Sequence, residues 1–433
     1  MKTLFRTAAL VGFLACAAMS TTLALAADPL RVGAGKTDIT PADLTALNPM
    51  GGGDFTRVHD PIYARALYLE SGASRAAIIS LDLIEVGDMT PLRQRIEREV
   101  GVPFNAIMIT ATHDHSAPRI GDVSPGALAH PGGPESKAYT LATFDRIVAA
   151  LKVAKAAAQP ARYGLAKGHA DVNVNRDLYT AKGWGMGFNP EGPSDKTVWA
   201  TRFETLDGKP IAVLFNYAVH NDVTLGAGEV TGDLSGVAQK YVEDSLGQGA
   251  VALWTMGPAG DQDPRVFPHV GMGGGSRDPA PAYRAAEAQG VMVGAEVVRV
   301  VRGIHDLSPT ARLVTDAREV SCPTKTGVNQ MADMTTVQVP EVKLRLGLIL
   351  LDDIAFTSVS GEVVTNIYSH LRAASPLTNT IMITLTNDRV GYIADDAAYD
   401  RPIFEVNGSP MARGCAENAI VGGLVAMIER QGR

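Results

Sequence analysis

The stretch Ile107-Met108-Ile109-Thr110-Ala111-Thr112-His113-Asp114-His115-Ser116 places a nearly continuous apolar run directly before two histidines. A short run of this kind is typical of a strand that is buried on both faces of an α/β sheet. Open α/β sheets bind their ligands at the carboxyl ends of the strands. Side chains two positions apart on an extended segment point the same way, so we expect His113 and His115 to face one cavity.

Strands and helices alternate on both sides of this stretch. Strands are expected at residues 65–70, 75–83, 107–111, 201–206, 211–219, 250–255, 342–351, 354–359 and 380–386. Helices are expected at residues 91–100, 139–157, 233–246, 283–304 and 416–431. No repeat, low-complexity tract or linker divides the chain. The sequence therefore predicts an α/β fold with mixed β-sheets flanked by helices, in a single large domain over residues 27–433.

The composition is that of a globular protein, with 433 residues, of which 46% are hydrophobic and 20% are charged. The formal net charge is −7. A net negative charge attracts neither nucleic acid nor an anionic membrane surface, so we expect no nucleic-acid partner.

Residues 1–26 have the pattern of a secretory signal peptide. Lys2 and Arg6 precede an apolar run at residues 8–18, and Ala24-Leu25-Ala26 is a small-x-small cleavage site. The run is shorter than the roughly 20 residues that a membrane-spanning helix needs, and residues 13–16 resemble a lipoprotein box only loosely. No later segment is long and apolar enough to cross a bilayer. We expect an exported protein, periplasmic or secreted, without a transmembrane segment.

Only Cys322 and Cys415 remain after this cleavage. They could pair in an oxidising compartment, but two cysteines in so long a chain are no disulfide framework. Two thiolates also cannot hold a structural zinc ion alone. The ligands of any bound metal must then be histidine, carboxylate or tyrosine.

Three further segments end apolar runs with polar residues. His220 follows 211–219, Glu362 lies in Ser360-Gly361-Glu362, and Tyr392 ends Asn387-Asp388-Arg389-Val390-Gly391-Tyr392. Each also has a structural explanation. The His113/His115 pair could be buried and hydrogen-bonded, and His220 could be structural. Glu362 could sit in the first turn of a helix, and Tyr392 could be half-buried packing.

Two known metal patterns do not fit the first segment. The metallo-β-lactamase pattern H-x-H-x-D-H fails, because Ala117 and Pro118 stand where Asp and His are needed. An amidohydrolase barrel carries its H-x-H on the first strand, and His113 comes too late for that.

Taken together, the four segments resemble the neutral, non-lysosomal ceramidases, zinc amidases that cleave the N-acyl bond of ceramide. The family's T-H-T-H-S, A-V-H and P-G-E stretches are similar to residues 112–116, 218–220 and 360–362. Its H-Y-[IV]-T-T-x-E-E-Y run is similar to residues 391–399, N-R-S-P to 175–178 and G-D-V-S-P to 260–264. The order is collinear from about residue 32 onward, which implies a single large catalytic domain.

The resemblance implies a Zn²⁺ cofactor held by His113, His220, Glu362 and Tyr392. Two imidazoles and a carboxylate are an ordinary catalytic zinc set, with room for a water whose pKa the metal lowers to about 7. His115 would be the general base and acid, and Arg176 would bind substrate oxygen or the developing oxyanion. The remaining matches imply substrate-side roles for Asp261, Asp263, Tyr399 and Phe404.

Two substrate-side positions depart from the family. Phe404 stands where the family has a tyrosine near the scissile amide, and Asp263 replaces the serine of G-D-V-S-P. We therefore expect an exported zinc hydrolase that cleaves ceramide or another small amphipathic acyl amide, with a drifted substrate preference. A zinc esterase or lactonase of the same fold, and an inactive metal- or ligand-binding relative, remain the alternatives. The sequence does not indicate an oligomeric state.

Overall fold

The computed structural model describes residues 27–50, 53–121, 134–270, 277–325 and 339–431, so the predicted signal peptide, residues 1–26, lies outside the described residues. The largest sheet has the strand order β12-β10-β9-β6-β1-β3-β4-β5, and β14 pairs with β1. Its strands are β1 (Asp28–Asp38), β3 (Tyr63–Ser71), β4 (Ser74–Leu81), β5 (Ile107–Ala111), β6 (Gln159–His169), β9 (Thr197–Thr205), β10 (Pro210–Tyr217), β12 (Val251–Met256) and β14 (Thr310–Ala311). Only residues 31–32 of β1 pair with β6, so two half-sheets meet at a short junction.

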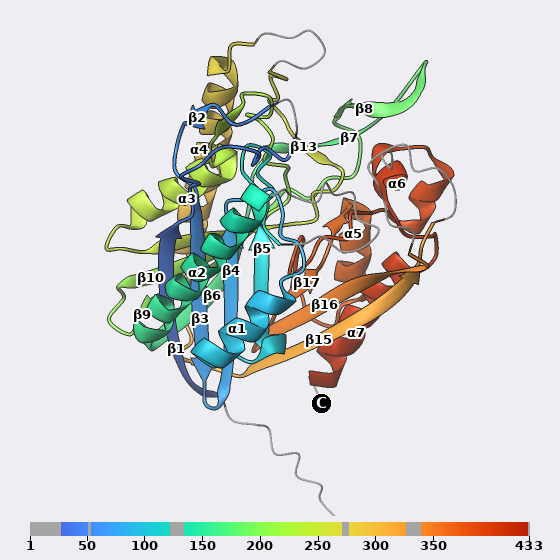
Figure 1. Ribbon diagram of the computed structural model, residues 1–433. Helices are drawn as coiled ribbons and strands as arrows, with labels where there is room; N and C mark the ends of the chain where they lie inside the picture. Colours follow the sequence, from blue (N-terminus) through green and yellow to red (C-terminus); the bar gives the residue numbers. More distant parts are fainter. Residues whose placement is uncertain (1–26, 51–52, 122–133, 271–276, 326–338, 432–433) are drawn as a thin grey trace, which may run out of the picture.

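Helices cover the two halves of this sheet separately. α2 (Pro134–Ala156) packs on β1 and β3 with α1 (Thr90–Val100) beside it, in front of the sheet in Figure 1. α3 (Asp233–Leu246) and α4 (Ala280–Arg302) pack on each other and on β12, β9 and β6. The hydrophobic core is correspondingly divided into one large cluster on the β1–β5 side and another under α3 and α4.

A second sheet packs beside the first. It has the order β15-β16-β17-β19, with β15 (Leu313–Pro323), β16 (Glu341–Leu351), β17 (Ile354–Val359) and β19 (Asn379–Ile383), and it carries its own core under α5 (Thr365–Ala374) and α7 (Ala416–Gln431). Three small sheets complete the fold: β13 (Gln262–Pro264), β7 (Asn173–Thr180) and β8 (Gly183–Asn189); β18 (Glu362–Val363) and β20 (Tyr392–Ile393); β2 (Arg57–Val58) and β11 (Glu229–Val230). The short helices are η1 (Phe104–Ala106), η2 (Asp396–Asp400) and α6 (Phe404–Gly408).

The carboxyl ends of several strands meet in one place. β5 runs parallel to β4, β10 to β12 and β17 to β19. Thr110 at the end of β5 bridges to Thr386 beyond β19, and the Thr384 amide donates to the Met256 carbonyl at the end of β12 at 2.8 Å. The segments that follow these strands are thereby brought to one edge, as expected for an α/β ligand site.

The prediction of mixed sheets flanked by helices is confirmed. The expected strand at 380–386 is wrong at its end, because the backbone turns into the left-handed region at Leu385 (φ 50°) and Asn387 (φ 65°). The strands β1, β6, β7, β8 and β15 are not among those expected from the sequence. Several of these strands mix exposed and buried positions, and in β8 every second residue from Gly183 to Gly187 is glycine. Their apolar patterns are therefore weak.

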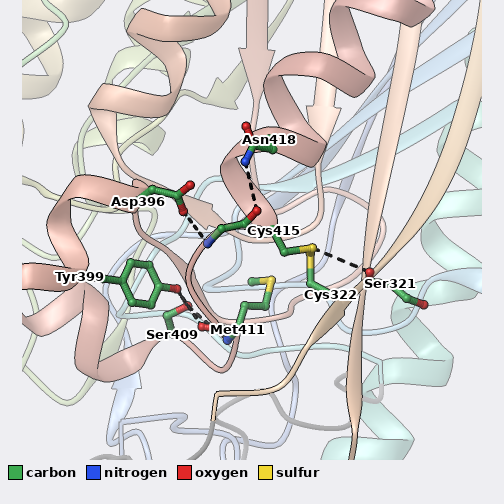
Figure 2. Close-up of a disulfide and its surroundings, with 9 residues drawn as sticks. Ser321, Cys322, Asp396, Tyr399, Ser409, Met411, Cys415 and Asn418 are labelled. Carbon is green, nitrogen blue, oxygen red and sulfur yellow. Dashed lines mark hydrogen bonds between the residues drawn. A yellow bond between two sulfur atoms is a disulfide. The ribbon is translucent and has the colours of Figure 1, made fainter.

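Cys322 and Cys415 form a disulfide (Figure 2). Cys322 lies on β15, the edge strand of the second sheet, and Cys415 directly precedes α7. The bridge joins residues 93 positions apart and so fixes the closing helix to the sheet edge. Among the described residues, no helix is both long and apolar enough to span a membrane.

Candidate metal centre

His113 and His115 follow β5, and their rings meet because the chain bends between them, not because the segment is extended. The segment is not extended, because His113 adopts a left-handed backbone (φ 63°). The chain then bends so that the two rings meet edge to face, with centroids 4.6 Å apart and Nε2 atoms 3.3 Å apart. A positive φ at a residue other than glycine is strained. The two imidazoles meet, but only His115 lines the cavity described below, and the extended geometry expected for this segment is wrong.

His220 follows β10 and joins this pair. Its ring centroid lies 4.6 Å from that of His113 and 5.6 Å from that of His115. The two histidine segments run side by side, since Asp114 and Asn221 form a parallel bridge and the His115 amide donates to the Asn221 carbonyl at 2.9 Å. The ligand atoms of the three histidines all lie within 4.8 Å of one another.

Glu362 lies on β18, which pairs in parallel with β20 so that Glu362 faces Tyr392 in the register. The preceding Gly361 permits this pairing, because an added Cβ would lie 2.9 Å from the Gly391 carbonyl oxygen. The Oε2 atom of Glu362 lies 3.2 Å from Nε2 of His113 and 3.7 Å from Nε2 of His220. The structure thus brings three imidazoles and one carboxylate together.

The protonation pattern of this cluster fits a bound divalent cation. Nδ1 of His113 donates to the Ile84 carbonyl at 2.8 Å, and Nδ1 of His220 donates to the Gln262 carbonyl at 3.1 Å. In the neutral form of each ring this leaves Nε2 as a lone pair that faces Glu362 Oε2, a buried carboxylate oxygen. Imidazoles oriented through Nδ1–H, with free Nε2 lone pairs, are the usual form of metal-bound histidine.

Burial and neighbouring groups shift the pKa values of three residues of the cluster. Burial and the neighbouring His113 hold the pKa of His115 well below its usual value, and burial together with Arg176 lowers the pKa of His220. Burial alone would raise the pKa of Glu362, but His113, His220 and Arg389 hold it well below its usual value. These shifts favour neutral rings at His115 and His220 and an ionised carboxylate at Glu362, which are donors of the kind that zinc takes.

Arg176 on β7 lies beside the cluster and is 2% exposed. Its Nη1 lies 3.4 Å from His220 Nε2, and its Nη2 donates to the Tyr392 hydroxyl at 3.4 Å. Burial would lower the pKa of Arg176, but Glu405, Tyr392 and Asp263 keep it well above its usual value. A permanent positive charge therefore stands next to the imidazoles and Tyr392.

A cavity of about 560 Å³ opens over this cluster. His115, Arg176, Asp263, Tyr392 and Phe404 line it, so five of the predicted site residues share one cavity. The Phe404 ring packs against both Tyr392 (centroids 5.4 Å apart) and the Arg176 guanidinium (5.2 Å). The remaining wall is mostly apolar and includes Met50, Val174, Met186, Phe188, Leu225 and Phe267.

Asp261 and Tyr399 are not brought to this cavity. One Asp261 oxygen accepts from the amide and hydroxyl of Thr365 at 2.9 and 2.8 Å, and the other accepts from Asn175 at 2.9 Å. Burial raises the pKa of Asp261 to about 6. The Tyr399 hydroxyl donates to the Met411 carbonyl at 2.8 Å, beside the disulfide in Figure 2. Their polar atoms hold α5 and the chain before α7, and the substrate-side roles of both residues stay predictions.

Four charged residues around the site are not among the predicted site residues. Glu405, fully buried, accepts from Arg176 Nε at 2.8 Å. Arg389 lies 3.2 Å from the other Glu362 oxygen and pairs with Glu85. Asp222, in the same segment as His220, lines the cavity with a buried Oδ1 that accepts no hydrogen bond. Arg389 and Asp222 lie inside segments already noted for their polar residues, whereas Glu85 and Glu405 carry no local sequence signal.

The chain matches one protein family by sequence and two solved structures by fold. The family model described as "Neutral/alkaline non-lysosomal ceramidase, N-terminal" matches residues 30–270. The fold is similar to the crystal structure of neutral ceramidase from Pseudomonas aeruginosa, with a TM-score of 0.74 and 18% identity, covering 93% of this chain and 75% of that one. A structure titled "Ceramidase complexed with C2" matches with the same TM-score and identity, covering 93% and 76%. No curated protein sequence matches this chain.

Proposed function

Because the chain belongs to the neutral/alkaline non-lysosomal ceramidase family, we propose that it is a zinc-dependent hydrolase of acyl amides, acting on ceramide or a related N-acyl amphiphile. One observation carries this proposal. The His113–His220–Glu362 cluster lies at an apolar cavity of about 560 Å³, and His115 belongs to both the cluster and the cavity wall. Such a cavity can hold an acyl chain while its carbonyl reaches the cluster.

The proposed zinc ligands are His113, His220, Glu362 and Tyr392. The first three present their donor atoms to one another, and Tyr392 is held against them by Arg176 and by its pairing with Glu362. A bound zinc ion supplies Lewis acidity and lowers the pKa of a coordinated water towards 7. The ligand atoms of His115 also lie within 4.8 Å of those of His113 and His220. Whether His115 is a fourth histidine or carboxylate ligand can therefore be tested directly.

His115 and Arg176 are the proposed catalytic residues. His115 reaches the cluster through Nε2 and lines the cavity, so it can take a proton from the attacking water and return it to the leaving amine. Arg176 keeps its charge beside the carbonyl position and can stabilise the oxyanion that develops there.

Two residues of the cavity lining support a substrate preference that has shifted away from long-chain ceramide. Asp263 lines the cavity and binds Arg176, and Phe404 presents a ring without a hydroxyl. We infer that long-chain ceramide is hydrolysed modestly and that smaller N-acyl amines or polyol-bearing amides are better substrates. Asp263 puts a carboxylate where the family has a serine, and its pairing with Arg176 makes it a modifier of the proposed oxyanion site.

The decisive experiment is turnover of paired amide and ester analogues, with and without chelator and with zinc restored. Chelator-sensitive hydrolysis of an amide supports the proposal. Hydrolysis restricted to the ester indicates a zinc esterase or lactonase. Retained metal without turnover on any acyl compound indicates an inactive binding relative, and the hydrolase proposal is then wrong.

We further propose that the protein is exported to the periplasm or secreted. The amino-terminal pattern at residues 1–26 and the Cys322–Cys415 disulfide support this, because disulfides persist mainly in oxidising compartments. Amino-terminal sequencing of the protein from a cell fractionation tests it. A mature chain that begins at Ala27 is expected, and an uncleaved chain in the cytoplasm would contradict export.

A further inference from the structure

The hairpin formed by β7 and β8 projects from the body of the protein at the upper right of Figure 1. Residues 183–188 read Gly-Trp-Gly-Met-Gly-Phe, so the large side chains all fall on one face of β8. Leu178 covers the glycine face, where an added Cβ at Gly187 would lie 2.8 Å from it. The Tyr179 ring stands opposite Trp184, with centroids 5.2 Å apart. The hairpin thus carries one largely apolar face, on which Asp177 stands opposite Met186.

Much of this face is exposed. Tyr179 is 68% exposed, Phe188 50% and Met186 49%, while Trp184 is half-buried. Exposed apolar side chains are common singly, but a contiguous group of them usually marks a binding surface. Here they are contiguous along a single strand and its partner.

The exposed face continues into the substrate cavity. Met186 and Phe188 line the cavity, and Met50 and Val266, which are 46% and 52% exposed, lie at or next to its lining. Five of the ten exposed large apolar side chains among the described residues are therefore on the hairpin or at the cavity mouth. This clustering separates the surface from ordinary scattered exposure.

Cations accompany the aromatic rings. The Arg265 guanidinium lies 5.4 Å from the Phe188 ring, and that of Arg401 lies 5.3 Å from the Trp184 ring. Lys182 is exposed at the turn of the hairpin. Arg265 also pairs with Asp171 at 3.1 Å. Aromatic rings beside Lys and Arg match the boundary of a bilayer, where rings enter the interface and cations meet lipid phosphates.

We propose that this surface, defined by Tyr179, Trp184, Met186 and Phe188 with Lys182, Arg265 and Arg401, docks on a phospholipid bilayer. The apolar face enters the interface and the three cations contact phosphate groups. The net charge of −7 gives no attraction for the molecule as a whole, so docking depends on this local surface. Docking places the cavity mouth against the lipid, where an amphiphile can enter without crossing water. The inference does not depend on hydrolysis, because docking is measured by binding alone.

The test is co-sedimentation of the full-length mature protein with vesicles of phosphatidylcholine, and of phosphatidylcholine with phosphatidylglycerol. Binding to both is expected, with tighter binding to the second. Brominated phosphatidylcholine should quench the fluorescence of Trp184, because the other two tryptophans, Trp199 and Trp254, are 1% and 0% exposed.

Tyr179→Ser should weaken vesicle binding about tenfold, since interfacial affinity scales with the apolar area buried. Tyr179 does not line the cavity, so turnover of a water-soluble acyl amide should be unchanged. Leu206→Ser is the matched control, because Leu206 is 55% exposed but lies at the turn after β9. Wild-type protein that binds neither vesicle, or a Tyr179→Ser variant that binds as well as the wild type, overturns the proposal. So does a dimer that Tyr179→Ser dissociates while vesicle binding is absent.

Discussion

Asp263 lies 3.0 Å from Arg176, with its Oδ1 accepting a hydrogen bond from Nη1 of the guanidinium. Glu405 holds the Nε atom of the same guanidinium at 2.8 Å. One buried cation therefore has two carboxylate partners, and one of them lines the substrate cavity. Because a carboxylate neutralises part of the charge that a cation offers to an oxyanion, this pair bears directly on the oxyanion role proposed for Arg176.

Exchanging Asp263 for serine and Phe404 for tyrosine should raise the turnover of long-chain ceramide. Asp263→Ser frees Nη1 while Glu405 still holds the guanidinium, and Phe404→Tyr adds a hydroxyl to the cavity wall. An increase in kcat/KM of about tenfold corresponds to roughly 1.4 kcal/mol of transition-state stabilisation. If the wild-type enzyme already prefers long-chain ceramide to every smaller amide, the drifted-substrate proposal is wrong.

His113→Ala and His220→Ala should each abolish bound metal and activity together while the protein stays folded. Both rings lie in the cluster, so either deletion leaves an incomplete donor set. Mass spectrometry measures the metal content, turnover of an acyl amide measures the activity, and circular dichroism shows that the protein stays folded. His305→Ala is the control, because His305 is exposed and outside the cluster. A metal-free double variant that keeps its activity would contradict the zinc proposal.

His115→Ala separates the two roles that its position allows. As a general base and acid it should retain the metal and lose about 10²–10⁴-fold in kcat. Metal analysis of the same preparation is the essential readout, since the His115 ring also lies within ligand distance of the other two histidines. Loss of metal from this variant would make His115 a ligand and require a revised coordination set.

Asp177→Asn should stabilise the protein at neutral to alkaline pH. Burial and the neighbouring Glu405 carboxylate raise the pKa of Asp177 to about 9, whereas an unfolded aspartate has a pKa near 3.9. Between about pH 4 and pH 9 the folded state keeps a proton that the unfolded state has lost, so the free energy of unfolding falls as the pH rises.

The asparagine removes this dependence and can still donate to Glu405. We expect a gain of ~1–3 kcal/mol at pH 8, less than full linkage gives because the Asp177 carboxyl is partly exposed, and almost none at pH 4. Urea unfolding at both pH values measures the difference. Asp306→Asn at an exposed position should change neither value, and equal effects at pH 4 and pH 8 would contradict the assigned pKa.

The sequence was most informative where chemistry is carried by short, contiguous segments. The apolar run before His113, the position of His220 after a strand and the Ser360-Gly361-Glu362 turn each indicated a strand end with a polar residue, and the structure brings these residues together. Strands with long apolar runs were also predictable, because burial on both faces selects apolar residues at every position. β8 was not, because alternating glycines leave too few apolar residues to form a pattern.

The sequence alone therefore determined the α/β class, the histidine and carboxylate donors and the resemblance to one family, because these depend on residue type and local order. Only the tertiary structure decided that His113 reaches His115 through a left-handed turn, that Asp263 and Glu405 share Arg176, and that Asp261 and Tyr399 do not line the cavity. The same holds for the Cys322–Cys415 bridge, whose partners lie 93 positions apart. Such relationships join residues from separate strands and loops, and their energies depend on distance and burial after packing, which local sequence order does not encode.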